Sequence, residues 1–186
     1  MNKNVGAKAL MSGTKVCLRP VTGPDLALLE CWDQDPEIEA LMGRRFTVVQ
    51  PTEWLRTHLT GRGGLAWMVE ECGTGRPVGE LELANLNRRA GNAEVRICLG
   101  EKEIWGHGYG REALTLALRF AFVTWRLRSV HLRVYTENVR AIRLYERIGF
   151  RKVGITPPSD RRGDSSPILL MELAQERWQR LQEEAV

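Results

Sequence analysis

The sequence has few of the residues that build metal centres and disulfide frameworks. Its 186 residues include three histidines and four cysteines, and no two cysteines stand in a C-x-x-C pair. Structural zinc sites need clustered cysteine and histidine ligands, so this composition argues against a metal site. Isolated thiols are typical of a reducing compartment, and we expect all four to be unpaired: Cys17, Cys31, Cys72 and Cys98.

Long apolar runs are also missing. The longest uncharged apolar run lies near residues 120–125, whereas a membrane span needs about 18 such residues. Residues 1–14 lack the apolar core of a secretory signal peptide. We therefore expect a cytoplasmic protein without a membrane segment, whose residues 1–13 form a flexible N-terminal arm.

Lysine is scarce, because 22 arginines and only 5 lysines carry the basic charge. The net charge is +4 and the charged residues are scattered along the chain, so the composition does not indicate a nucleic-acid partner. With 43% hydrophobic and 27% charged residues, the chain resembles an ordinary globular domain that can bury one core. Its length is typical of a single domain.

The hydrophobic pattern predicts one α/β domain over residues 14–174. We expect a mixed, mostly antiparallel sheet of six to seven strands flanked by helices, followed by a helical tail over 175–186. Alternating apolar residues predict strands over 14–20, 65–71, 78–83, 94–99, 130–134, 150–155 and 168–173. Apolar residues three and four apart predict helices over 25–42, 52–60, 108–125, 138–148 and 175–185. The first of these is expected to be interrupted at Asp35 and Pro36, because proline favours the start of a helix.

A glycine-rich stretch, W-G-H-G-Y-G-R-E-A at 105–113, precedes one predicted helix. Gly106, Gly108 and Gly110 let the backbone adopt a positive φ or approach a ligand closely. The N–H groups in the first turn of the helix then suit a pyrophosphate, to which Arg111 adds a charged contact. A plain turn explains these glycines as well.

Two other phosphate motifs do not fit this stretch. The pattern G-x-x-x-x-G-K-[ST] is absent from the sequence. In the dinucleotide pattern G-x-G-x-x-G, the third glycine would fall at Arg111, and three predicted strands already precede it. Both a P-loop nucleotidase and a Rossmann domain are therefore disfavoured.

A second informative stretch lies at residues 135–154. Helical spacing places Asn138, Ala141, Leu144 and Tyr145 on one face. Taken singly, Asn138 is also explained as a helix cap. Tyr145 is also explained as a half-buried core aromatic with its hydroxyl at the rim.

Together the two stretches resemble the GNAT family, the N-acetyltransferases that use acetyl-CoA. I-W-G-H-G-Y-G-R-E-A-L at 104–114 is similar to the family's pyrophosphate loop, and N-V-R-A-I-R-L-Y-E-R-I-G-F-R-K-V-G at 138–154 is similar to its second CoA-binding segment. L-R-P-V-T-G-P-D at 18–25 and W-D-Q-D-P-E at 32–37 look like the branch that acts on ribosomal-protein N-termini and related small amines. That branch often has a small residue where this sequence has Arg96, which leaves the acceptor type open.

The resemblance implies an acyl-CoA N-acyltransferase fold and direct transfer of the acetyl group of acetyl-CoA to a primary amine, without a metal. It implies that the strand 94–99 splays from its neighbour, so that backbone N–H groups near 97–99 hold the pantetheine arm and polarise the thioester. A homodimer is common in the family. The implied acetyl-CoA-binding residues are Ile97, Cys98, Leu99, Trp105, Gly106, His107, Gly108, Tyr109, Gly110, Arg111, Glu112, Asn138, Ala141, Leu144 and Tyr145.

Two catalytic roles follow from the same resemblance. An alkylammonium acceptor must lose a proton before it attacks, and Glu94 matches the family's general base, which acts through water. Tyr145 matches the acid that protonates the departing thiolate. An ion pair with Arg96 or Arg133 explains Glu94 equally well.

Three further residues are candidates with competing explanations. Glu80 and Glu82 on the preceding strand are alternative bases or acceptor ligands, and structural salt bridges explain them too. Cys98 is a conceivable nucleophile, but we interpret it as a packing residue.

Two other classes of function stay open: a non-catalytic module that binds acyl-CoA as a sensor, and a basic nucleic-acid binder. Loss of turnover in general acid and base variants separates an enzyme from a sensor. A steep salt dependence would identify nucleic-acid binding. The sequence does not choose among a protein N-terminus, an amino acid, a polyamine and an aminoglycoside as acceptor.

Overall fold

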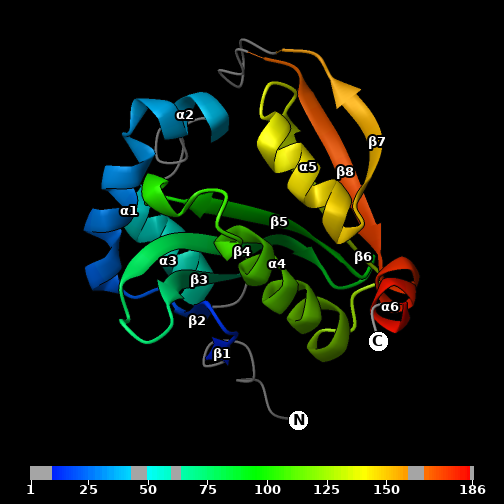
Figure 1. Cartoon of the computed structure of the whole chain (residues 1–186), viewed down its shortest axis with the longest axis horizontal. Coiled ribbons are helices and arrows are strands. Elements are labelled where there is room, and N and C mark those ends of the chain that lie inside the picture. The colour runs from blue at the N-terminus through cyan, green and yellow to red at the C-terminus, as the bar shows by residue number, and fades with distance from the viewer. Residues whose placement is uncertain (1–9, 43–49, 60–63, 159–165, 185–186) are drawn as a thin grey trace.

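An eight-stranded mixed sheet forms the centre of the computed structural model, which describes residues 10–42, 50–59, 64–158 and 166–184 (Figure 1). The strand order is β1-β2-β3-β4-β5-β6-β8-β7, and the β5–β6 pair is parallel while the other pairs are antiparallel. The strands are β1 (Met11–Ser12), β2 (Val16–Pro20), β3 (Gly64–Glu71), β4 (Pro77–Asn87), β5 (Asn92–Leu99), β6 (Ser129–Tyr135), β7 (Arg151–Thr156) and β8 (Ile168–Ala174).

The α/β class and the mixed sheet are confirmed, and the sheet has one strand more than predicted. The additional strand is β1, whose Met11 and Ser12 pair with Leu18 and Cys17 of β2. This strand falls inside the arm predicted over residues 1–13. The rest of that arm, residues 1–9, lies outside the described residues.

In the described parts of the chain, six α-helices connect and cover the strands (Figure 1). The helix predicted over 108–125 is shorter than expected, because the chain changes after Arg119 to a π-helical turn over Phe120–Thr124. No helix in the described ranges is long and apolar enough to cross a membrane. The helices are α1 (Leu26–Asp33), α2 (Pro36–Met42), α3 (Pro51–Leu59), α4 (Tyr109–Arg119), α5 (Val139–Ile148) and α6 (Gln175–Glu183).

Two groups of helices cover opposite faces of the sheet (Figure 1). The larger core lies under α4 and α5, and a smaller one lies under α1, α2 and α3. Side chains alternate between these faces along each strand. On β4, Leu81 and Leu83 therefore join the larger core, whereas Glu80 and Glu82 are buried on the opposite face.

The sheet opens between β5 and β6. Register pairs join these strands only from Asn92 to Glu94 on β5, while β5 stays paired with β4 as far as Leu99. From Val95 onward, β5 therefore has a strand neighbour on one side only. This opening agrees with the splay that the family resemblance implied.

Two of the cysteines predicted to be isolated are joined. Cys17 in β2 and Cys72, directly after β3, form a disulfide with their Cα atoms 5.5 Å apart. Their sequence separation is 55 residues, so no local spacing pattern signals the pair. Among the described residues, Cys31 and Cys98 take part in no disulfide; Cys31 is exposed and Cys98 is buried.

Candidate functional site

The glycine-rich loop ends at the N-terminus of α4, and backbone conformation explains two of its glycines. Gly106 and Gly108 have φ values of 84° and 90°, which residues with a side chain rarely adopt. Gly108 is the N-cap of α4, and no side chain caps the helix there. The N–H groups of the first turn have no partner within the helix, so they form a site suited to an anion.

Gly110 and Trp105 place this loop beside the sheet opening. A Cβ atom on Gly110 would lie 3.3 Å from the Leu99 side chain and 3.5 Å from that of Leu144, so glycine lets α4 approach both β5 and α5. The indole N–H of Trp105 donates to the Leu99 carbonyl oxygen at 2.8 Å. The anion site therefore lies next to the part of β5 that has left β6.

A cation–π contact that no sequence motif indicated joins the loop to α5. The guanidinium of Arg140 lies 4.0 Å from the centroid of the Trp105 ring. Arg140 belongs to the first turn of α5, and Trp105 to the loop before α4. The stack therefore bridges the two elements that resemble the family's CoA-binding segments.

The helix α5 begins with the cap that one interpretation predicted. The Asn138 side chain accepts a hydrogen bond from the Ala141 N–H at 3.1 Å, and its amide group donates to the Leu41 carbonyl oxygen of α2 at 3.4 Å. Ala141 and Leu144 pack against the larger core. Asn138 thus ties α5 to a helix on the other face of the sheet.

Tyr145 is buried near Cys98. Burial, with a smaller contribution from Cys98, raises the pKa of Tyr145 to about 12. Tyr145 belongs to the core under α4 and α5, whereas Cys98 belongs to the core on the opposite face. The two residues therefore lie on opposite faces of the sheet, and the effect of Cys98 on Tyr145 acts between those faces.

Buried carboxylates lie on the α1–α3 face beside that opening. Glu80 is 1% exposed and directly opposite Cys98 in the β4–β5 register. Glu82 is fully buried opposite Arg96 and accepts a hydrogen bond from the Trp54 indole at 3.0 Å. These are the two carboxylates that the sequence suggested as alternative bases.

Glu94 is held in an ionic cluster. Its carboxylate accepts hydrogen bonds from Arg96 at 3.0 and 3.1 Å, from Arg133 at 3.2 Å and from the Asn85 amide at 2.7 Å. Burial opposes its ionisation, but these partners outweigh burial and lower the pKa of Glu94 to about 2. A carboxylate with so low a proton affinity is a poor base, so these contacts do not favour the base role predicted from the sequence.

Two residues assigned to acetyl-CoA binding face other partners. The Glu112 carboxylate accepts hydrogen bonds from the backbone N–H groups of Thr14, Lys15 and Val16 at 2.6 to 2.9 Å. The Tyr109 hydroxyl donates to Glu71 at 2.6 Å. Their side chains therefore hold the start of α4 to the ends of β2 and β3.

The remaining predicted residues divide between the loop and the strand. His107 and Arg111 are exposed, on the loop and in the first turn of α4. Ile97 and Leu99 are partly buried on the unpaired part of β5. Lys15, which sequence patterns did not single out, donates through its ammonium group to the His107 carbonyl oxygen at 2.7 Å.

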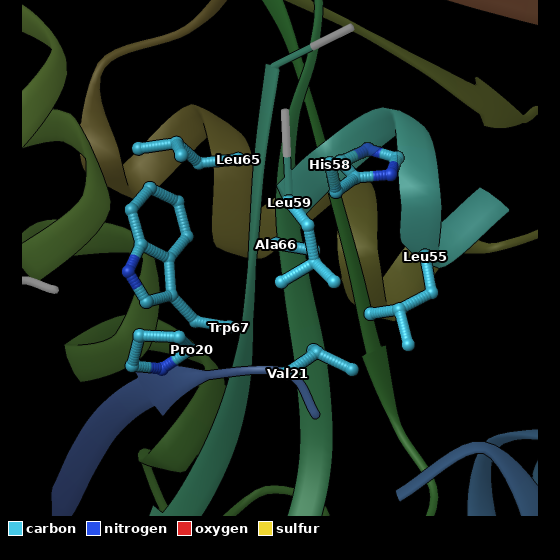
Figure 2. Close-up of a pocket in the computed structure, with 8 residues that line it drawn as sticks. All are labelled: Pro20, Val21, Leu55, His58, Leu59, Leu65, Ala66 and Trp67. Atoms are coloured by element: carbon cyan, nitrogen blue, oxygen red, sulfur yellow. The ribbon is translucent and has the colours of Figure 1, made fainter. Parts of the chain in front are cut away.

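A small pocket lies elsewhere, between β3 and α3 (Figure 2). Figure 2 shows it lined by Leu55 and His58 of α3 and by Ala66 and Trp67 of β3, among others. Its volume is about 20 Å³, which is room for about one water molecule. This pocket is too small to hold a substrate, and the site at the β5–β6 opening is distinct from it.

The family model of the acetyltransferase (GNAT) domain matches residues 15–151. An uncharacterized protein of Methanocaldococcus jannaschii is 28% identical over 150 residues, which are 78% of this chain and 30% of that protein. The spermidine N(1)-acetyltransferase of Vibrio cholerae is 34% identical over 77 residues, 41% of this chain and 44% of the enzyme. The chain thus spans less than half the length of these two curated relatives.

Solved structures share the fold over most of the chain. The spermidine N-acetyltransferase of Vibrio cholerae, in complex with CoA and spermine, has a TM-score of 0.77 at 22% identity, covering 90% of this chain and 99% of that one. A putative acetyltransferase from T. thermophilus has a TM-score of 0.73 at 25% identity, covering 94% of each chain.

Proposed function

The chain belongs to the GNAT acetyltransferase family, and we propose that it transfers the acetyl group of acetyl-CoA to a primary amine. The observation that carries the proposal is the uncapped N-terminus of α4, which Gly110 places against the part of β5 that has left β6. The anion site at the start of α4 suits the pyrophosphate of CoA. The open side of β5 offers backbone groups that suit the pantetheine arm and the thioester. We further propose direct attack of the amine while both substrates are bound.

The residues present fit acetyl-CoA. The N–H groups at the start of α4 would bind the pyrophosphate, with His107 and Arg111 exposed beside them. The backbone of Ile97, Cys98 and Leu99 would bind the pantetheine arm and polarise the thioester carbonyl. Acetyl-CoA would supply the activated acetyl group, and these residues would position it.

We assign the general base to Glu80. It is the carboxylate opposite Cys98, and Cys98 is close enough to Tyr145 to raise its pKa. Glu94 is four residues farther from Cys98 along the strand, about 13 Å at 3.3 Å per residue, and its oxygens are engaged by arginines. The position opposite Cys98 therefore favours Glu80, and the low proton affinity of Glu94 argues against Glu94.

Tyr145 would protonate the departing thiolate. With a pKa of about 12, its hydroxyl keeps its proton at neutral pH and can donate it as negative charge grows on sulfur. Burial excludes bulk water from this position, so we assign the proton donation to Tyr145. Cys98 would remain a packing residue beside it.

The acceptor that fits best is a cationic alkylamine. Glu80 and Glu82 are buried carboxylates on the α1–α3 face of the sheet, and a protonated amine is attracted to such groups. Spermidine acetyltransferases among the relatives favour a polyamine. The branch acting on ribosomal-protein N-termini stays a prediction, as does a dimer.

The test is ligand binding followed by turnover. Acetyl-CoA at 100 times its dissociation constant should stabilise the fold by about 2.7 kcal/mol, whereas NAD and ATP should not shift the melting temperature. Spermidine, an amino acid, an aminoglycoside and an N-terminal peptide are then compared by release of free thiol. Stabilisation without turnover of any amine would favour an acyl-CoA sensor, and no stabilisation would contradict the proposal.

Glu80→Gln and Tyr145→Phe test the catalytic roles. Each should lower kcat by about 100-fold or more if the side chain moves a proton in the transition state. Unchanged kcat in either variant would contradict the role assigned to that residue.

A further inference from the structure

The Cys17–Cys72 disulfide lies beside the proposed acetyl-CoA loop. It links β2 to the turn that follows β3. Both cysteines are partly exposed, so a reductant can reach them. The loop at 105–111 is far from both cysteines in sequence, yet the segments next to each cysteine contact it directly.

The segment before Cys17 holds the loop through Lys15. The Lys15 ammonium donates to the His107 carbonyl oxygen at 2.7 Å, and a Cβ atom on Gly108 would lie 3.7 Å from that nitrogen. The Lys15 N–H donates to Glu112, in the first turn of α4, at 2.7 Å. Both contacts depend on the position of the strand end that Cys17 anchors.

The segment around Cys72 holds the same region from the other side. The Cys72 N–H donates to the Lys15 carbonyl oxygen at 2.8 Å. Glu71, the preceding residue, accepts the hydrogen bond of the Tyr109 hydroxyl at 2.6 Å. The disulfide therefore joins the two segments whose side chains fix the start of α4.

We propose that this disulfide is a reversible clamp on the acetyl-CoA loop, and that its redox state sets the affinity for acetyl-CoA. The proposal rests on the proposed function, since it concerns the loop assigned to the cofactor. With the disulfide formed, Lys15 and Glu71 are held against the loop before acetyl-CoA binds. With the disulfide reduced, both segments gain conformational freedom, and ordering them on binding costs affinity.

The chemistry is ordinary thiol–disulfide exchange. A dithiol reductant attacks the Cys17–Cys72 bond, which breaks as each sulfur gains one electron and one proton. The reductant is oxidised to its own disulfide, so atoms and electrons balance. Reoxidation by a small-molecule disulfide reverses both changes.

The test first establishes the thiol state of the protein as purified without reductant. Alkylation under denaturing conditions, followed by mass spectrometry, should label two of the four cysteines before reduction and all four after it. Labelling of four cysteines in the unreduced protein would overturn the proposal.

Calorimetric titration with acetyl-CoA then measures affinity in both states. Acetyl-CoA is the appropriate ligand because it has no free thiol that could reduce the protein. Reduction should raise its dissociation constant about fivefold or more, the lower end of coupling between distinct sites. The double variant Cys17→Ser, Cys72→Ser should have the dissociation constant of the reduced protein, and reductant should no longer change it. Cys31→Ser, which changes a free exposed thiol, should behave as the wild type.

Lys15→Met tests the route of the effect. It should weaken binding in the oxidised protein and change little after reduction, because the contact it removes is one that reduction loosens. Circular dichroism confirms that each form is folded at the temperature of titration. Equal dissociation constants in both redox states would overturn the clamp, whereas no binding in either state would overturn the proposed function instead.

Discussion

Glu94→Gln separates a structural role of this carboxylate from the base role that the family resemblance assigned to it. Lowering the pKa of Glu94 from 4.5 to about 2 corresponds to about 3 kcal/mol, at about 1.4 kcal/mol for each tenfold change in proton affinity. Glutamine keeps the shape of the side chain but removes the negative charge that pairs with Arg96 and Arg133. We therefore expect the variant to lose about 3 kcal/mol of unfolding free energy at pH 7.

The loss should depend on pH in a defined direction. Because the pKa is lower in the folded protein, ionised Glu94 stabilises the fold fully above pH 4.5, and the stabilisation fades as the pH falls toward 2. The difference between wild type and variant should therefore shrink over that range. Urea unfolding followed by tryptophan fluorescence, at pH 7 and at several acidic pH values, measures it.

A matched control and an activity assay complete the experiment. Glu53→Gln removes an ion pair with Arg56 at 2.7 Å, but both partners are exposed on α3, so it should cost far less stability than Glu94→Gln. In Glu94→Gln, kcat should stay within a few-fold of the wild type, while the KM for acetyl-CoA rises. A variant with wild-type stability and a kcat lowered about 100-fold would refute this reasoning and restore Glu94 as the base.

Three other changes probe the cofactor side of the site. Tyr145→Phe should lower kcat while leaving the KM for acetyl-CoA and the melting temperature nearly unchanged, as steady-state kinetics and thermal unfolding will show. Gly108→Ala forces a side chain into a left-handed conformation at a cost of about 1–2 kcal/mol and should weaken acetyl-CoA binding in calorimetry. Gly75 is also left-handed, and a Cβ atom there would have no neighbour within 4 Å. Gly75→Ala should therefore reduce stability alone, and equal affinities in the two variants would contradict a loop-specific effect. Arg140→Ala should raise the KM for acetyl-CoA about two- to fivefold, because it removes a stacking energy of about 0.5–1 kcal/mol. Arg143→Ala is the control, since Arg143 is exposed on the same helix. The same rise in KM for both variants would rule out the Trp105 stack as its cause.

Most of the fold was predictable because its signals are local. Alternation along seven strands and the apolar spacing of the helices depend on neighbouring residues alone. The eighth strand, Met11–Ser12, is too short to show alternation and exists because β2 offers it an edge. The π-helical turn after Arg119 keeps an apolar pattern that resembles the preceding helix, so the pattern gave no reason to end that helix early.

The geometry of the candidate site was predictable where its residues form a motif and was not where they meet only in the folded chain. The glycines of the loop and the cap at Asn138 carry their own conformational signature. Lys15 and Glu112, by contrast, are 97 residues apart and meet because β2 passes under the start of α4. The β2–β3 register places Cys17 opposite Glu70, two residues before Cys72, and spacing along the chain does not reveal this proximity.

Glu94 shows why a residue type at the expected strand position does not establish a catalytic role. It occupies the last register pair between β5 and β6, opposite His131, and Arg133 on β6 binds its carboxylate from beyond that point. The ion pair thus bridges the two strands where they begin to part. A base must release and regain a proton, and at this position each protonation would weaken the contact between β5 and β6. An ionised Glu94 is suited to holding β5 and β6 together where they begin to part. We place the proton transfer on Glu80 instead, because Glu80 lies opposite Cys98, on the part of β5 that no longer pairs with β6.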